Sequence, residues 1–137
     1  YTLKFPTGNV TADRFLKVDS VSGSGATGVG QLSFGEVSGG TSWQAVKTSG
    51  FTAVAGEGYF CNTTSAAFTA TLPSSGTIGD EISFIDYAGT FDTNNLTIGR
   101  NSHNIQGSAA DLTVSTERAG FTLVYVDSTQ GWLLKDK

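Results

Sequence analysis

Several residue types that would narrow the function are scarce in this sequence or missing from it. The 137 residues include no methionine, one cysteine, one histidine and two prolines, and only 15% of them are charged. A single cysteine excludes an intrachain disulfide, and Cys61 lies in an alternating apolar pattern where a buried, inert thiol is expected. Because an initiator methionine is missing, we expect a processed N-terminus or, more simply, the C-terminal part of a longer protein.

Basic charge and long apolar runs are also lacking. The formal net charge is −4, whereas a nucleic-acid-binding chain is expected to carry a basic stripe. The same negative charge disfavours an anionic membrane surface, and no apolar run approaches the length of a membrane span. The sequence therefore predicts neither nucleic acid nor membrane insertion.

What the chain has instead is glycine, serine and threonine between short alternating segments. The 18 glycines punctuate stretches in which apolar and polar residues alternate with a period of two, which is typical of strands with one buried face. In the stretch from Phe51 to Arg100, we expect Tyr59, Cys61, Phe68 and Leu72 to face the core. Short strands with turn signals every ~8–12 residues predict an all-β sandwich or barrel-like domain. Two of these turns, at residues 73–76 and 128–131, are expected to close hairpins.

The first forty residues differ from the rest. They hold three short strand patterns, which bury too little surface to fold without partners, and identical copies are the simplest partners. The segment Gly35–Ser42 has the composition of a boundary. We therefore expect a short intertwined β stalk over 1–40 and a small antiparallel β-sandwich or barrel-like head over 41–137, in a homotrimer.

Several sequence segments resemble those of tail fibres and other fibrous virion proteins of marine phages. The opening is similar to a module of these proteins through YTLKFP, DRFLKVDSVSGSG and GQLSFGEV. The second part resembles their C-terminal domain, especially in cyanophages, through GEGYF, AFTATLPSS, IGDEISFIDYAGTF, NNLTIGRN, IQGSAADLTVSTE and TLVYVDSTQGW. The resemblance implies a homotrimeric all-β fibre or knob with no catalytic residues in its pattern.

From this resemblance we expect a structural virion protein at the distal end of a trimeric phage fibre, which attaches to a host-surface polysaccharide or protein receptor. Such a protein is made in the host cytoplasm and joins other virion proteins through its N-terminal side. One alternative is a capsid decoration or collar fibre with a purely structural role. Another, less favoured, is a polysaccharide-cleaving tail spike.

Aromatic residues near turns are the first place to look for a receptor site. Trp43, Tyr87, Phe91 and Trp132 flank turns and are expected to be partly exposed. Aromatic rings stack on sugar faces while amides and arginine bind hydroxyls. The resulting candidate receptor-binding residues are Tyr87, Phe91, Asn94, Asn95, Arg100, Asn101 and His103. The simpler interpretation is that the aromatics cover the small core or the trimer interface.

Metal and catalytic interpretations of the polar residues are weaker. Three copies of His103 on a three-fold axis would be needed to bind a metal, and its surroundings are those of an ordinary polar loop. The segment from Asp86 to Asn95 lacks the closing glutamate of a calcium loop. A glycosidase pair from Asp80, Glu81 and Asp86 is disfavoured because neighbouring strand residues point in opposite directions. We expect no metal, no cofactor and no enzymatic activity.

Overall fold

The computed structural model describes residues 2–4, 14–22, 29–36 and 40–136. The chain divides into two compact units, Tyr1–Gly39 and Gly40–Lys137. In the first unit, β3 (Val29–Glu36) pairs in parallel with β1 (Thr2–Lys4) and antiparallel with β2 (Arg14–Ser22). Of the predicted boundary, residues 37–39 lie outside the described ranges. The predicted stalk and its intertwining with other copies stay predictions.

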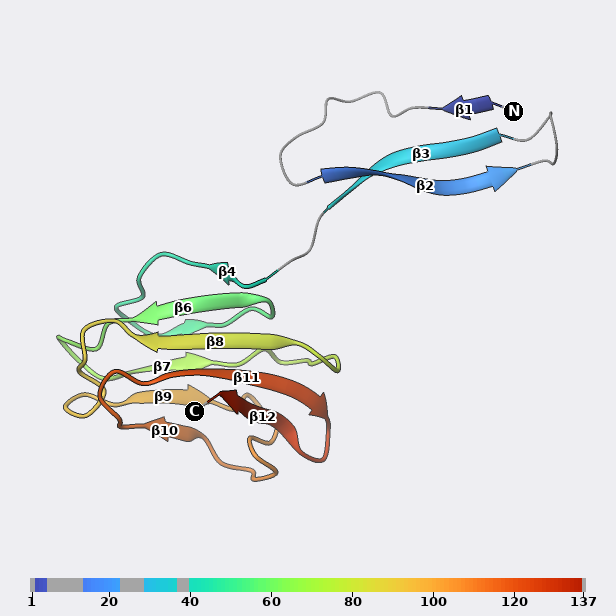
Figure 1. Ribbon diagram of the computed structural model, residues 1–137. Coiled ribbons are helices and arrows are strands. Elements are labelled where there is room, and N and C mark those ends of the chain that lie inside the picture. Colours follow the sequence, from blue (N-terminus) through green and yellow to red (C-terminus); the bar gives the residue numbers. More distant parts are fainter. Residues whose placement is uncertain (1, 5–13, 23–28, 37–39, 137) are drawn as a thin grey trace. The chain divides into compact units, whose positions relative to one another are not determined.

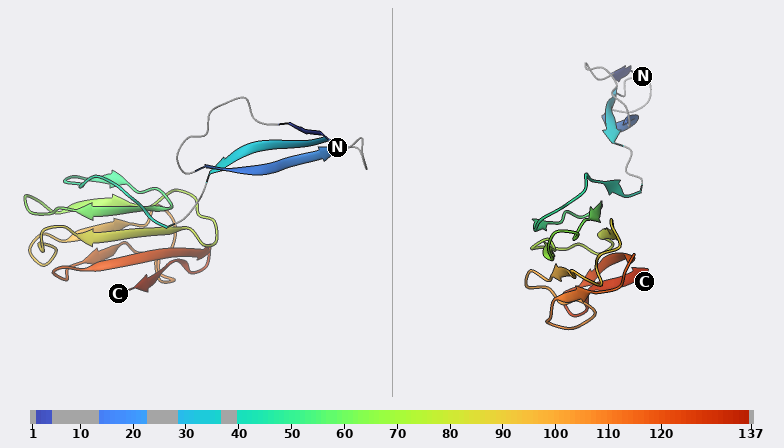
Figure 2. Two further views of the ribbon diagram at one scale, coloured as in Figure 1. Left: turned by 45° about the horizontal axis from the view of Figure 1, so that its top comes forward. Right: turned by 90° about the vertical axis from the view of Figure 1, so that its left-hand side faces the viewer.

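The second unit is an all-β, sandwich-like structure of two mixed sheets (Figure 1; Figure 2). The five-stranded sheet has the order β12-β11-β8-β6-β4 and the four-stranded sheet the order β10-β9-β7-β5. The strands of the first are β4 (Ser42–Trp43), β6 (Glu57–Cys61), β8 (Glu81–Asp86), β11 (Gly120–Asp127) and β12 (Gly131–Asp136). Those of the second are β5 (Phe51–Thr52), β7 (Phe68–Thr71), β9 (Leu96–Gly99) and β10 (Leu112–Val114). Among the described residues, no helix is long and apolar enough to cross a membrane.

The expected antiparallel pairing is wrong for the first part of this unit. From β4 to β9 the chain alternates between the two sheets, and β4, β6 and β8 pair in parallel, as do β5, β7 and β9. Parallel neighbours need a crossover connection, and here each crossover contains a strand of the opposite sheet. Only β10, β11 and β12 pair antiparallel with their neighbours. The chain thus winds between the two sheets from β4 to β9, and the antiparallel strands β10, β11 and β12 complete the sheets.

The turn segments explain why the sequence pattern was misinterpreted. The segment Pro73–Gly76, expected to close a hairpin, instead leads from β7 in one sheet to β8 in the other. A turn signal marks where a strand ends and carries no information about which strand pairs with it. By contrast, the predicted hairpin at the C-terminal end is confirmed, because β12 folds back on β11 with Tyr125 opposite Trp132.

The core lies between the two sheets. The five-stranded sheet contributes an in-register row in which Tyr59, Phe84 and Phe121 are direct neighbours, with ring centroids 5.9 and 5.4 Å apart. Facing side chains such as Leu72 are fully buried. The predicted burial of Tyr59, Cys61 and Leu72 is confirmed, whereas Phe68 is only half-buried and packs against the core.

Two aromatic residues expected at the surface belong to this core. Phe91 and Trp132 are both fully buried, although each lies next to a turn in the sequence. The expectation of partial exposure is wrong for this pair because the adjoining loops fold back over the sandwich. It is confirmed for Trp43 and Tyr87, which are 45% and 50% exposed.

A buried hydroxyl fixes the turn that leads into β6. The Tyr59 hydroxyl accepts a hydrogen bond from the Val54 N–H at 2.8 Å and donates one to the Glu57 carboxylate. Burial, together with the donated bond to Glu57, raises the pKa of Tyr59 to about 12. The hydroxyl therefore stays protonated at any pH at which the sandwich is expected to be folded, and it holds both sides of this turn.

Candidate functional site

The loop from Tyr87 to Asn95 is built around the carboxylate of Asp86. One carboxylate oxygen accepts the N–H groups of Gly89 and Thr90 at 3.0 and 3.1 Å, and the other accepts those of Phe91 and Arg118 at 3.1 and 3.0 Å. Burial alone would raise the pKa of Asp86, but the four donors outweigh it and hold the pKa below its usual range. The backbone of this loop is therefore fixed from inside.

Arg118 fixes the same loop from outside. Its guanidinium donates a hydrogen bond to the Tyr87 carbonyl at 2.9 Å. A Cβ atom on Gly89 would lie 2.8 Å from the Arg118 Nε, so the arginine side chain crosses directly over that glycine. Sequence reasoning missed Arg118, because its only local signal is a left-handed backbone with φ of 60°, which no sequence pattern reveals.

The amides and hydroxyls of the loop are largely used for its own architecture. Asn94 Nδ2 donates to the Thr63 carbonyl at 2.9 Å, and the hydroxyls of Thr63 and Thr90 lie 2.8 Å apart. Asn95 is half-buried beside it. Phe91 fills the core and must be withdrawn from the candidate receptor-binding residues. Tyr87 is left as the exposed aromatic ring of this loop.

The second predicted loop, which follows β9, is held as firmly. Asn101 Nδ2 donates to the Leu72 carbonyl at 2.9 Å, and His103 Nε2 donates to the Ser74 carbonyl at 2.9 Å. The His103 ring also meets the Tyr125 ring edge-on, with centroids 5.5 Å apart. Arg100 donates its guanidinium N–H to the His103 carbonyl at 3.2 Å. The side-chain groups of Asn101 and His103 are thus engaged within the chain, which fits a structural role better than a ligand-binding one.

The two predicted loops do not form one site. The first follows β8 and the second follows β9, and these strands run in opposite directions in the two sheets, so the loops lie at opposite ends of the sandwich (Figure 1). The hydrogen bonds agree with this placement, because Asn94 contacts the segment after β6 and Asn101 contacts the residue that follows β7. The predicted set therefore splits into Tyr87, Asn94 and Asn95 at one end and Arg100, Asn101 and His103 at the other.

The ionisable groups are engaged separately. The three acids considered as a glycosidase pair have different partners: Asp86 holds its loop, Asp80 accepts the Thr77 N–H at 2.9 Å, and Glu81 pairs with Lys135 at 3.1 Å. Burial, with the nearby Asp86 charge, raises the pKa of Cys61 to about 12, so its thiol is protonated at neutral pH. Within residues 40–136 and the described strands of the first unit, no group of three or more histidine, cysteine or acidic residues is placed to hold a metal ion.

One hollow lies away from the predicted residues. It measures about 310 Å³ and opens beside β10 and β11, where Leu112, Val114, Ala119 and Leu134 line it. Its lining is mostly apolar and contains none of the seven predicted residues. The hollow lies between β10 of one sheet and β11 and β12 of the other.

A scan against models of known protein families finds no match for this chain, and a search among curated proteins finds no significant relative. The functional argument therefore depends on the residues themselves. We call the end of the sandwich that carries the exposed Tyr87 ring and Arg118 the Tyr87 end.

Proposed function

We propose that this chain is the distal part of a homotrimeric fibre on a phage virion, and that its second unit attaches the virion to a host-surface receptor. The sequence segments that resemble fibrous virion proteins support the fibre. The receptor contact is carried by one observation: a half-exposed ring, Tyr87, on a loop whose backbone is fixed by Asp86 and Arg118.

A fixed loop favours binding because little conformational entropy is lost when a ligand docks. The Tyr87 ring offers an apolar face for stacking and a hydroxyl for a hydrogen bond, a combination that suits the ring face and hydroxyl groups of a sugar. The proposal therefore selects a cell-surface polysaccharide as the receptor class to test first. In this proposal the N-terminal side joins other virion proteins.

Replacing Tyr87 with alanine is expected to weaken adsorption of the chain to host cells by roughly tenfold or more, which is the loss typical of a central aromatic contact. Tyr87→Phe keeps the stacking face and is expected to retain most of the adsorption. Adsorption is measured with the fluorescently labelled 137-residue chain on cyanobacterial cells, the hosts that the resemblance implies. Thr69→Ala, on the exposed outer side of β7, is the control and should adsorb as the unmodified chain does.

The alternatives give different results in the same assay. A capsid decoration or collar fibre would not adsorb to host cells and would not compete with infection. A polysaccharide-cleaving spike would release reducing ends from host polysaccharide, whereas the proposed receptor-binding head would release none. Adsorption that is unchanged by Tyr87→Ala would contradict the assignment of the Tyr87 end.

A further inference from the structure

A row of residues crosses the outward side of the five-stranded sheet. The strand register places Trp43 opposite Gly58 and Gly58 opposite Ser83. It also places Thr122 between Ser83 and Asp136. The three middle residues are small, so the row is low between the indole at one end and the carboxylate at the other. With neighbouring strands about 4.8 Å apart, the part of the row from Gly58 to Asp136 spans roughly 14 Å.

Trp43 is held in a fixed orientation at its end of the row. It stacks on Phe60, with ring centroids 4.9 Å apart and an angle of 27° between the rings. It also lies over Gly58, where a Cβ atom would come within 2.6 Å of the indole ring. Trp43 is nevertheless 45% exposed. A ligand that stacks on this ring therefore meets a surface whose conformational entropy is already lost.

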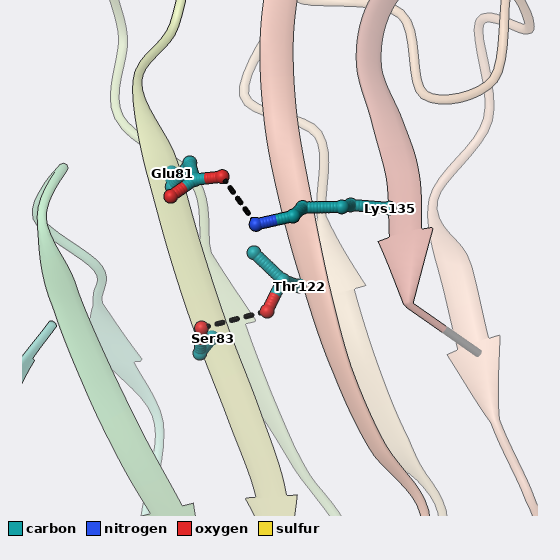
Figure 3. A network of polar contacts seen from close by, with 4 residues as sticks. All are labelled: Glu81, Ser83, Thr122 and Lys135. Atoms are coloured by element: carbon teal, nitrogen blue, oxygen red, sulfur yellow. Dashed lines mark hydrogen bonds and ion pairs between the residues drawn. The ribbon is translucent and has the colours of Figure 1, made fainter. Parts of the chain in front are cut away.

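The floor of the row is polar. Figure 3 shows Ser83 and Thr122 facing each other beside the ion pair of Glu81 with Lys135. The two hydroxyls lie 2.8 Å apart, and the ion pair measures 3.1 Å. In a hydroxyl pair one group donates to the other, and the accepting hydroxyl keeps its own hydrogen for a further partner. Because Glu81 and Lys135 neutralise each other, the charge that the row itself presents is that of Asp136.

A hollow of about 210 Å³ follows this row, and we call it the Trp43 trough. Every member of the row except Gly58 lines it, and so do Ile85 and Gly120. Gly120 lies opposite Ile85 across the strands and contributes no side chain, which leaves room in the trough. Pockets that enclose a whole drug-sized molecule usually measure ~300–1,000 Å³. The Trp43 trough therefore suits part of a longer molecule better than an entire small ligand.

The position of the trough disfavours an extended peptide as its ligand. Its floor lies on β8 and β11, each of which pairs with a strand on both sides. Their backbone groups are used within the sheet, so a peptide cannot be recognised here by strand addition. The trough offers hydroxyls, a carboxylate and an indole ring instead. These groups bind hydroxyls and stack on the apolar face of a ring, which are the contacts that a sugar chain needs.

We propose that the Trp43 trough binds a segment of a neutral, linear polysaccharide, with one sugar ring stacked on Trp43 and the next rings crossing the hydroxyls toward Asp136. A neutral chain is selected because an acidic one would meet the Asp136 carboxylate on a protein with a net charge of −4. The inference needs neither the fibre nor the trimer. It adds a sugar contact whose lining residues do not include Tyr87.

Isothermal titration of the 137-residue chain with linear, neutral hexasaccharides of glucose, galactose, mannose or N-acetylglucosamine tests the site. At least one of these probes is expected to bind, and Trp43→Ala is expected to weaken its binding roughly tenfold or more. Thr69→Ala, on the four-stranded sheet, is the control and should bind as the unmodified chain does. Thermal melts followed through the buried Trp132 check that each variant is folded.

A second variant, Gly120→Val, keeps the test decisive if Trp43→Ala does not fold. A Cβ atom on Gly120 would lie 3.8 Å from the Ile85 side chain, which is an ordinary contact, and valine is favoured in strands. The variant is therefore expected to fold while its side chain fills the trough. Because the added side chain occupies the space of the sugar, Gly120→Val is expected to bind the same hexasaccharide roughly tenfold more weakly.

The outcomes separate this inference from the proposed function. Binding of none of the hexasaccharides, or binding that is unchanged in Trp43→Ala and Gly120→Val, overturns the trough as a sugar site and leaves the receptor contact of Tyr87 to its own adsorption test. Binding that is lost in Tyr87→Ala but kept in Trp43→Ala places the sugar at the Tyr87 end and likewise overturns the inference. Binding of mixed-sequence hexapeptides and of no sugar assigns the trough to a peptide and also overturns it.

Discussion

Replacing Asp86 with alanine is expected to lower the free energy of unfolding by about 3–5 kcal/mol, because several N–H donors are left without an acceptor. Four backbone N–H groups that point at its carboxylate would lose their acceptor at once. Urea unfolding of the purified chain measures the effect. Asp111→Ala is the control: Asp111 is exposed and accepts a single N–H, from Arg100, so a loss of about 1 kcal/mol or less is expected.

The same carboxylate makes the stability depend on pH in a defined direction. Its pKa is lowered in the folded state, so the charged form stabilises the fold above the unfolded-state pKa of about 3.9. This contribution is lost as the pH falls through the folded-state pKa. The stability difference between the unmodified chain and Asp86→Asn is therefore expected to be largest near neutral pH and to shrink below about pH 4. A difference that stays constant down to pH 3 would contradict this role of the charge.

Replacing Gly131 with alanine is expected to lower the free energy of unfolding by about 2–5 kcal/mol. This loss has two causes, the left-handed backbone at this position and a steric clash of the added Cβ atom. Gly131 has a φ of 71°, and a Cβ atom there would lie 1.8 Å from the Asn104 carbonyl oxygen. That carbonyl cannot move freely, because it accepts the N–H of Trp132 at 2.9 Å.

Gly79→Ala separates the two contributions to the Gly131 effect. Gly79 also has a left-handed backbone, with φ of 92°, but a Cβ atom there would meet nothing within 4 Å. Its replacement is expected to cost about 1–2 kcal/mol from backbone conformation alone. Thermal melts compare the stability of the two variants. Equal losses of stability would mean that the steric clash with the Asn104 carbonyl contributes nothing to the effect at Gly131.

Alternation within single strands predicted much of the fold. Tyr59 and Cys61 on β6, and Phe121, Leu123 and Tyr125 on β11, are buried as the period of two indicates. Such a pattern is local, so it reports which side of a strand is covered. It does not report the neighbouring strand, and for this reason the parallel winding of β4 to β9 was not foreseen.

The candidate site was harder to predict than the core. Residue type alone placed Phe91 with Tyr87, yet the hydrogen bonds to Asp86 turn the Phe91 backbone so that its ring enters the core. Residue type also grouped Asn94 with Asn101, because they are only seven positions apart in the sequence, whereas β9 separates the loops that hold them. Arg118 joins the Tyr87 end only through tertiary structure.

The structure also separates the roles of the four aromatic residues that flank turns. Sequence patterns left open whether the aromatic residues cover the core, an interface or a ligand. The structure assigns Phe91 and Trp132 to the core and leaves Trp43 and Tyr87 exposed. Trp43 lies at the edge strand β4 of the five-stranded sheet, and Tyr87 belongs to the loop proposed as the receptor contact.

The most direct test of the central claim, a trimeric attachment fibre, is the mass of the unmodified 137-residue chain by sedimentation equilibrium at several concentrations. The account predicts the mass of three chains, with no dissociation at micromolar concentration. A stable monomer across the whole range would contradict it.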